Sequence, residues 1–124
     1  MSKILVIEDE DALREMYTKM LTDEQFTADS APDGEQGMKK VIDFNPDLIL
    51  LDLIMPKMNG FQVLQQLKGN EVTKNIKVVV LTNIYADQQE LIQQGADRVL
   101  MKTDYNPGQI VQIVKDTLQK SVVA

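Results

Sequence analysis

The chain has 124 residues, 44% hydrophobic and 26% charged, which fits a single globular domain with its own core. It has no cysteine and no histidine, which excludes disulfides, thiolate catalysis, sulfur-based zinc sites and most triad chemistry. With 19 acidic and 13 basic residues the net charge is -6, which disfavours non-specific binding to a nucleic-acid backbone. No apolar run approaches the roughly 18 residues of a membrane span and no signal-peptide pattern follows Met1, so we expect a cytoplasmic protein.

Four short apolar runs predict buried strands. They occupy residues 4–7, 48–51, 78–81 and 99–101, and they are continuous rather than alternating, as in parallel strands covered on both faces. Residues 26–31 are more polar and predict a fifth strand at one edge of the same sheet.

Helical patterns separate the predicted strands. In residues 13–21 and again in 110–118, apolar residues recur at i, i+3, i+4 and i+8, so each segment presents one stripe for packing on a sheet. Capping residues, a proline and glycines mark the bounds of the helices. Asp33 with Gln36 and Asn106 with Pro107 predict the starts of two helices. Gly60 opens a further helix and Gly95 ends the fourth.

Strand and helix alternate five times with short connections, which predicts one doubly wound α/β domain over residues 1–124. Right-handed crossovers then place helices on both faces of a parallel sheet. In such sheets, ligands bind beyond the carboxyl ends of the strands, where the strand order reverses. The residues that end the strands are therefore the candidate site.

Charged and polar side chains end four of the five predicted strands. Glu8 and Asp9 follow the first strand, while the next two acids are better placed to stabilise a helix N-terminus. Asp52 interrupts an apolar run, where an ionised carboxylate without partners costs several kcal/mol. This cost favours a functional role for Asp52 over an N-cap or a structural ion pair.

Thr82 and Lys102 end the fourth and fifth strands. Each alone is more often structural, but the topology gathers three carboxylates, one hydroxyl and one amine at one edge. Because histidine and cysteine are absent, this set suits Mg²⁺, or Mn²⁺. An anion held by the metal would be a phosphoryl group, whose other oxygens would bind the ammonium of Lys102 and the hydroxyl of Thr82. The nucleophile can only be a carboxylate, which gives an aspartyl phosphate.

These strand-end residues resemble those of a response-regulator receiver domain, and the resemblance runs over nearly the whole chain. Glu8 and Asp9 stand in the family's acidic pair. Residues 52–60, DLIMPKMNG, resemble its phosphoacceptor loop residue for residue. Thr82 and Lys102 fall where the family's hydroxyl and lysine stand.

The resemblance implies a flavodoxin-like fold, with five parallel strands in the order 2-1-3-4-5 and helices on both faces. It implies that Asp52 is the phosphoacceptor and that Thr82 and Lys102 bind the phosphoryl oxygens. It also implies Mg²⁺ as the cofactor. The implied metal ligands are Asp52, Asp9 directly, Glu8 through water, and the backbone carbonyl of Ile54.

The resemblance also implies partners. The donor would be a phosphohistidine of a sensor kinase or of a phosphotransfer protein. Output would pass to an unidentified protein at the surface of the fourth helix, fifth strand and fifth helix, with no role for nucleic acid or membrane. We expect the domain to stand alone and to signal by protein contact, as a phosphoacceptor regulator that catalyses only its own phosphoryl transfer and dephosphorylation.

Two other functions stay open. A pseudo-receiver would keep the fold as an interaction module without switching by phosphate. A Mg²⁺-dependent phosphatase would share the aspartyl phosphate, but the general acid it needs two residues after Asp52 is replaced by Ile54. A flavodoxin-like electron carrier is disfavoured, because four acids after the first strand would repel a cofactor phosphate.

The chain also departs from the family pattern. Thr103 replaces the proline that usually follows the lysine across a cis peptide. Because a non-proline cis bond costs about 3 to 4 kcal/mol, we expect either a trans bond with a rearranged loop or a strained cis bond. Val99 replaces the aromatic ring that swings inward on activation, so we expect the switch to rest on Thr82 and the loop after it, with Tyr85 as a substitute reporter.

Bulky side chains are expected around the phosphoryl group. Asn83 occupies a position that the family keeps small, which narrows access to the site. Ile54 and Ile84 are large and apolar where an attacking water must approach. We therefore expect slow self-dephosphorylation.

Overall fold

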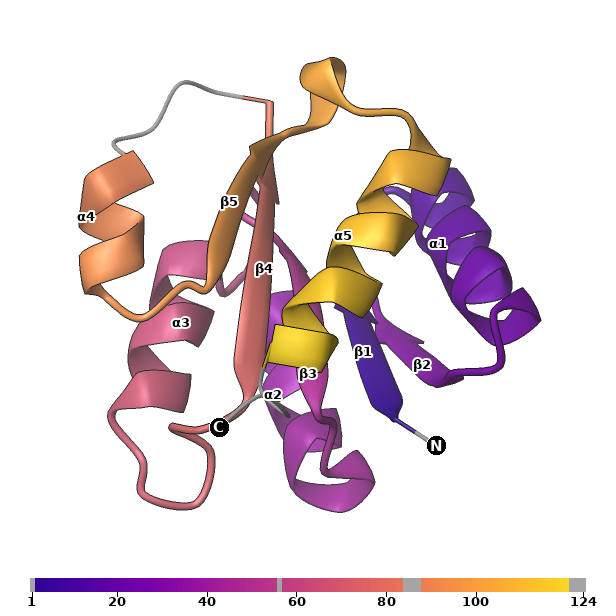
Figure 1. The fold of residues 1–124 in the computed structure, drawn as a ribbon. Helices are drawn as coiled ribbons and strands as arrows, with labels where there is room; N and C mark the ends of the chain where they lie inside the picture. The colour runs from indigo at the N-terminus through magenta and orange to yellow at the C-terminus, as the bar shows by residue number, and fades with distance from the viewer. Residues whose placement is uncertain (1, 56, 84–87, 121–124) are drawn as a thin grey trace.

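The computed structural model describes residues 2–55, 57–83 and 88–120, in which strands and helices alternate along the chain (Figure 1). The strands are β1 (Lys3–Ile7), β2 (Thr27–Ala31), β3 (Leu48–Asp52), β4 (Lys77–Thr82) and β5 (Arg98–Met101). The helices are α1 (Asp11–Asp23), α2 (Gly34–Phe44), α3 (Gly60–Lys68), α4 (Gln88–Gln93), a 3₁₀ turn η1 (Lys102–Asp104) and α5 (Pro107–Lys120).

The five strands form one parallel sheet in the order β2-β1-β3-β4-β5, which confirms the predicted flavodoxin-like fold. β2, the more polar strand, lies at an edge as expected, and its first four residues are at least partly exposed. The chain leaves β1 toward β2 on one side and returns to β3 on the other. The strand order therefore reverses between β1 and β3, and this is where a doubly wound sheet binds its ligands.

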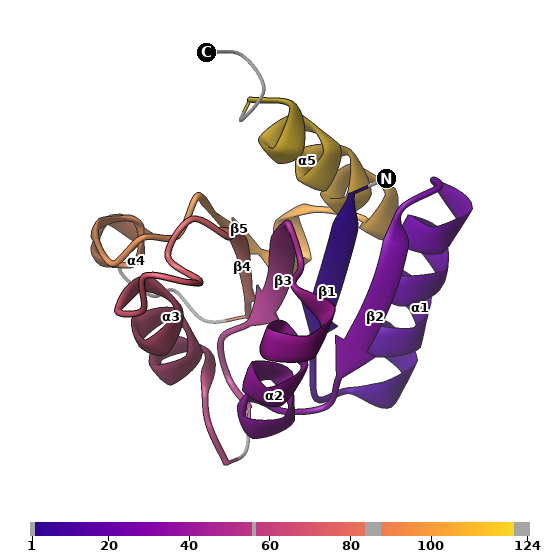
Figure 2. The same ribbon diagram turned by 90° about the horizontal axis from the view of Figure 1, so that it is seen from below.

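Helices cover both faces of the sheet (Figure 2), and a hydrophobic cluster lies between the sheet and the helices on each face. Alternate residues along each strand point to opposite faces, so Leu5 and Ile7 pack toward α2, α3 and α4, while Ile4 and Val6 pack toward α1 and α5. Both faces exclude water, which explains why the central strands are continuously apolar.

Capping side chains fix where the helices begin. Asn106 accepts a hydrogen bond from the Gln109 amide at 2.8 Å, and the Gln109 side chain accepts one from the Asn106 amide at 2.9 Å, so the predicted start of α5 is a full capping box. Asp33 accepts from the Gln36 amide at 2.8 Å at the start of α2. In the described residues, no helix is both long enough and apolar enough to pass through a lipid bilayer.

Candidate functional site at the carboxyl ends of β1 and β3

Backbone hydrogen bonds extend the sheet one residue past the strands that carry the acids. The Glu8 amide donates to the Ala31 carbonyl at 3.1 Å, beyond the end of β1. The Leu53 amide donates to the Leu81 carbonyl at 3.0 Å, just after Asp52 ends β3. Both acids thus project from backbone that the sheet itself holds in place.

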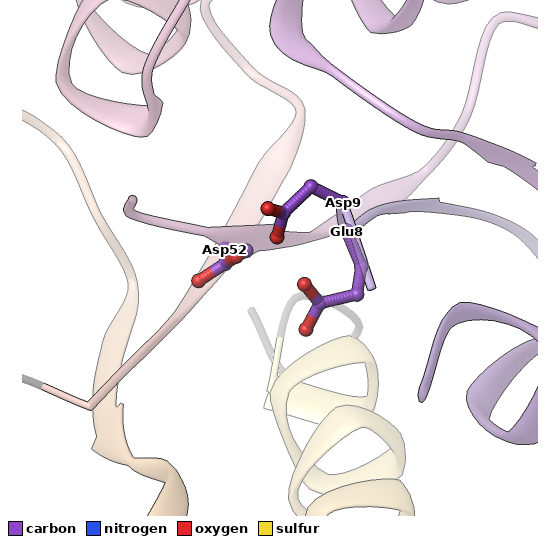
Figure 3. Close-up of side chains that lie close together, drawn as sticks. All are labelled: Glu8, Asp9 and Asp52. Atoms are coloured by element: carbon purple, nitrogen blue, oxygen red, sulfur yellow. The ribbon is translucent and has the colours of Figure 1, made fainter. Parts of the chain in front are cut away.

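The side chains of Glu8, Asp9 and Asp52 converge between the ends of β1 and β3 (Figure 3). One carboxylate oxygen from each lies within 4.8 Å of the others. Glu8 is 2% exposed and Asp52 6% exposed, whereas Asp9 faces solvent. Such close carboxylates repel one another unless protons or cations neutralise them, and oxygen atoms at this spacing suit a hard dication.

Lys102 supplies a positive charge to this cluster. Its Nζ lies 2.6 Å from Glu8 Oε1 and 3.3 Å from Asp52 Oδ1, and its side chain is only 12% exposed. The second carboxylate oxygen of Glu8 accepts a hydrogen bond from the Glu10 amide at 3.3 Å. Glu8 is therefore paired on both oxygens, and Lys102 links the ends of β1, β3 and β5.

Burial and neighbouring charges shift the pKa values of the cluster in different directions. Burial raises the pKa of Asp52 to about 8, with Glu8 adding to the effect and Lys102 opposing it. Burial also acts to raise the pKa of Asp9, but hydrogen bonds to Glu8 and Asp52 outweigh it and the pKa is lowered. Burial acts to lower the pKa of Lys102, but its hydrogen bond to Glu8 and the charge of Asp52 raise it. Without a metal, the cluster therefore holds a proton on Asp52 at neutral pH.

An open cleft of about 470 Å³ lies over the cluster. The residues that line it are Glu8, Asp9, Glu10, Asp52, Ile54, Asn83 and Lys102. Thr82, which we expected to bind a phosphoryl oxygen, ends β4 and is 1% exposed, and it is not among the lining residues. Its neighbour Asn83 faces the cleft in its place.

Sequence reasoning missed Arg14 as a residue of this site. Its Nη1 donates to the Glu8 carbonyl at 3.0 Å, and its Nη2 pairs with Asp11 at 2.5 Å, with the side chain 16% exposed. The arginine thereby ties the first turn of α1 to the backbone of the acidic segment. The i, i+3 spacing from Asp11 is the signal that could have suggested it.

The residues that depart from the family pattern have ordinary structural roles. The described residues contain no cis peptide bond, and Lys102 and Thr103 begin the turn η1, which is the first of the two alternatives we expected. Val99 pairs with Val80 across β5 and β4 and packs, partly buried, on the α2–α4 side of the sheet. Ile84 and Tyr85 lie outside the described residues.

A doubly wound parallel sheet with an acidic cluster and a lysine at its switch point defines a class of signalling domain. The family model of the response regulator receiver domain matches residues 4–115. The chain therefore belongs to the response regulator receiver domain family, as its resemblance predicted. Receiver domains are parts of two-component systems, are generally non-enzymatic signalling proteins, and typically use phosphorylation and Mg²⁺.

Two of the similar curated proteins are DNA-binding regulators by name. The chain is 36% identical over 104 residues to the DNA-binding dual master transcriptional regulator RpaA of Synechocystis sp., covering 82% of this chain and 43% of that protein. It is 34% identical over 122 residues to the DNA-binding response regulator MtrA of Mycolicibacterium smegmatis, covering 96% and 51%. The chain thus spans about half the length of the curated relatives it matches.

Solved receiver structures share the fold. The Vibrio cholerae chemotaxis protein CheY4 superposes with a TM-score of 0.86 and 26% identity, covering 94% of this chain and 98% of that one. The receiver domain of the Francisella response regulator 1452 superposes with a TM-score of 0.87 over 98% and 99%, and at 20% identity it supports the fold alone.

Proposed function

We propose that this domain, residues 1–124, is a phosphorylation-dependent switch in which Asp52 accepts a phosphoryl group from a phosphohistidine. The donor is a sensor kinase or a phosphotransfer protein. The observation that carries the proposal is the convergence of three carboxylates and one buried ammonium at the carboxyl ends of β1 and β3. One Asp52 oxygen forms a bond to phosphorus while the P–N bond breaks, and that electron pair stays on the imidazole nitrogen of the donor.

The donor set fits Mg²⁺, because it offers only oxygens and Asp52 keeps a raised pKa when no metal balances the acids. Asp9 and Asp52 would bind the ion directly and Glu8 through water. The Ile54 carbonyl would add a backbone ligand at the edge of the same cleft. When bound, Mg²⁺ supplies positive charge against the phosphoryl oxygens.

Lys102 and Thr82 would bind the remaining phosphoryl oxygens. The Lys102 ammonium already lies 3.3 Å from Asp52 Oδ1, so a small movement would bring it into contact with an oxygen of the phosphoryl group on Asp52. Thr82 is buried at the end of β4 and is not among the residues that line the cleft, so we expect that the end of β4 must move for its hydroxyl to donate to the phosphoryl group. This requirement couples phosphorylation to a shift at the end of β4 and in the loop that follows it.

A phosphoryl group adds close to two negative charges, which changes the relative free energies of the resting and active arrangements. We propose that the change reaches a partner protein through the surface of α4, β5 and α5. The net charge of -6 disfavours direct contact of this domain with the phosphate backbone of a nucleic acid. We therefore propose that residues 1–124 do not themselves carry the DNA binding that is named for the relatives.

Intact mass after incubation with a small phosphodonor and Mg²⁺ tests the proposal. The wild type is expected to gain one phosphoryl mass, and Asp52→Asn is expected to gain none because it lacks the attacking oxygen. Asp43→Asn, which changes an exposed acid of α2, is the matched control and should be labelled like the wild type.

Other outcomes of the same assay would point to the other functions. If neither the small donor nor a kinase labels the wild type, the domain is a pseudo-receiver, for which the aliphatic Val99 is the favouring observation. Steady release of phosphate from an added phosphate monoester would indicate a phosphatase. Equal labelling of the wild type and Asp52→Asn would place the phosphoryl group on another residue.

Ile54 is expected to slow hydrolysis of the aspartyl phosphate. It lines the cleft and is 53% exposed, so its side chain occupies space that an attacking water needs. Ile54→Gln should shorten the phosphoryl lifetime about fivefold, which corresponds to ~1 kcal/mol in the barrier. Ile42→Gln, at an isoleucine of α2 that is 78% exposed, is the control. Equal lifetimes for the wild type and Ile54→Gln would rule out this role.

A further inference from the structure

The first residue of α2, Gly34, lies against the segment that follows the phosphoacceptor. A Cβ placed at Gly34 would lie 2.2 Å from the Met58 carbonyl oxygen, 2.9 Å from Met58 Cβ and 2.7 Å from Val63 Cγ2. Contacts under 3.0 Å are essentially never seen for real Cβ atoms, and two of these three atoms belong to the fixed part of Met58. Glycine is thus required here because of the close approach of two chain segments.

Asp33, the residue before it, makes a second contact with the same segment. Its Oδ1 accepts from the Gln36 amide, and its Oδ2 lies 3.7 Å from Lys57 Nζ. The Asp33 side chain is 7% exposed, and Lys57 has a φ of 63°, the left-handed region that costs a lysine about 1 kcal/mol. The ion pair thus joins the cap of α2 to a residue in an unfavourable conformation.

The β3–α3 loop, described at residues 53–55 and 57–59, is also closed at its base. The Gly60 amide donates to the Leu53 carbonyl at 2.8 Å, and a Cβ at Gly60 would lie 2.6 Å from the Asp52 carbonyl oxygen. The loop is therefore held at its two ends by β3 and α3, and on its side by Asp33 and Gly34. Asp52 is the last residue of β3, and Ile54 lies between these supports.

We propose that Asp33 and Gly34 are positioning residues for phosphoryl acceptance: they set the β3–α3 loop so that the Ile54 carbonyl and the Asp52 carboxylate face the same cation. This inference rests on the proposed function and deepens it, because it adds a part of the molecule that does not touch the reacting atoms. A displaced Met58 backbone would shift the loop relative to Asp9, which is held separately at the end of β1.

Two alanine variants of α2 test the proposal. Gly34→Ala pushes on the Met58 backbone. Gly37→Ala, three residues along the same helix, pushes mainly on Ile7 Cδ1, the far end of a flexible side chain, at 2.5 Å. The two changes are chemically identical, and both disturb the packing of α2, but only the first acts on the loop. The measurements are the Mg²⁺ dissociation constant by calorimetry, hydrogen exchange of the Gly60 amide, and the free energy of unfolding in EDTA.

Gly34→Ala is expected to weaken Mg²⁺ binding about fivefold and to speed exchange of the Gly60 amide, since both depend on the loop. Gly37→Ala should lower stability while both loop measurements stay within about twofold of the wild type. If Gly34→Ala lowers only the free energy of unfolding, as Gly37→Ala does, the role is structural and the proposal is overturned.

A double variant keeps the proposal falsifiable if Gly34→Ala does not fold. Asp33→Asn with Lys57→Gln keeps an acceptor for the α2 cap, removes the ion pair and leaves the local net charge unchanged. We expect Mg²⁺ binding about twofold weaker and faster Gly60 exchange. Wild-type values for both measurements would overturn the proposal. Failure of the wild type to accept phosphate would instead count against the proposed function, and the exchange comparison would still test the positioning of the loop.

Discussion

Lys102→Met is expected to lower the free energy of unfolding of the metal-free domain by about 3 kcal/mol above pH 8, where Asp52 is ionised. Lys102 contacts both buried acids of the cluster, at 2.6 Å from Glu8 and 3.3 Å from Asp52. Methionine fills similar space but leaves two buried charges without their partner. Removing one member of a buried ion pair costs much more than removing a surface pair.

The pH dependence of this effect follows from the two pKa values. The pKa of Lys102 is raised above 10.5, so its contribution is fully present below pH 10.5 and is lost only as the pH rises through the folded value. Below pH 8, Asp52 takes up a proton and needs the ammonium less. The cost of Lys102→Met should therefore shrink as the pH falls, and Mg²⁺ should restore part of it at high pH.

Urea unfolding in EDTA and in Mg²⁺ measures both effects. Lys115→Met is the control, because it removes the pair between Lys115 and Glu24, whose side chains are 31% and 46% exposed, and should cost no more than about 1 kcal/mol. A Lys102→Met protein as stable as the wild type in EDTA above pH 8 would show that the ammonium does not neutralise the cluster.

Asp52→Asn is expected to stabilise the metal-free domain at neutral pH, on the order of 2 kcal/mol. The folded pKa of Asp52 is about 8, raised by burial from 3.8. Between these values Asp52 binds a proton in the folded protein that it releases in the unfolded chain, so the contribution of Asp52 to stability declines as the pH rises from about 4 to about 8. Asparagine at this position removes the decline.

The advantage of Asp52→Asn should disappear toward pH 4, where the acid is protonated in both states. In Mg²⁺ the order should reverse, because the wild type gains binding free energy that a neutral amide cannot supply. Unfolding midpoints across this pH range, with and without Mg²⁺, measure both effects. Asp43→Asn, at an exposed acid, should stay within about 0.5 kcal/mol of the wild type. A stability difference between Asp52→Asn and the wild type that does not grow as the pH rises in EDTA would contradict the raised pKa of Asp52.

Much of the fold could be predicted from local sequence patterns. The continuous apolar runs correspond to β1, β3, β4 and β5, and Asn106 caps α5. These features depend on neighbours a few residues away, so periodicity and capping chemistry are sufficient to find them. The strand-end acids could be predicted for a related reason, because parallel strands all end at the same edge of the sheet.

Other features of the site depend on contacts between distant segments. The apolar pattern placed Thr82 at the end of β4. That Thr82 is buried while Asn83 lines the cleft depends on how the end of β4 packs against the rest of the protein. The contact between Lys102 and Glu8 joins residues 94 positions apart. Gly34 follows Asp33, which the sequence predicted at a helix start, but the approach of Gly34 to Met58 depends on how closely α2 packs beside the β3–α3 loop.

The sequence by itself determined the order of strands and helices, the class of the sheet and the kinds of side chain at its carboxyl edge. It did so because hydrophobic periodicity depends on residues that are close together in the chain. Right-handed crossovers between parallel strands then bring the carboxyl ends of the strands to one edge. Only the tertiary structure decided which acids are buried, that Lys102 contacts two of them, and that α2 packs closely against the loop after Asp52. Burial and ion pairing depend on distances between helices and strands, and those distances are set when the helices and strands pack against one another.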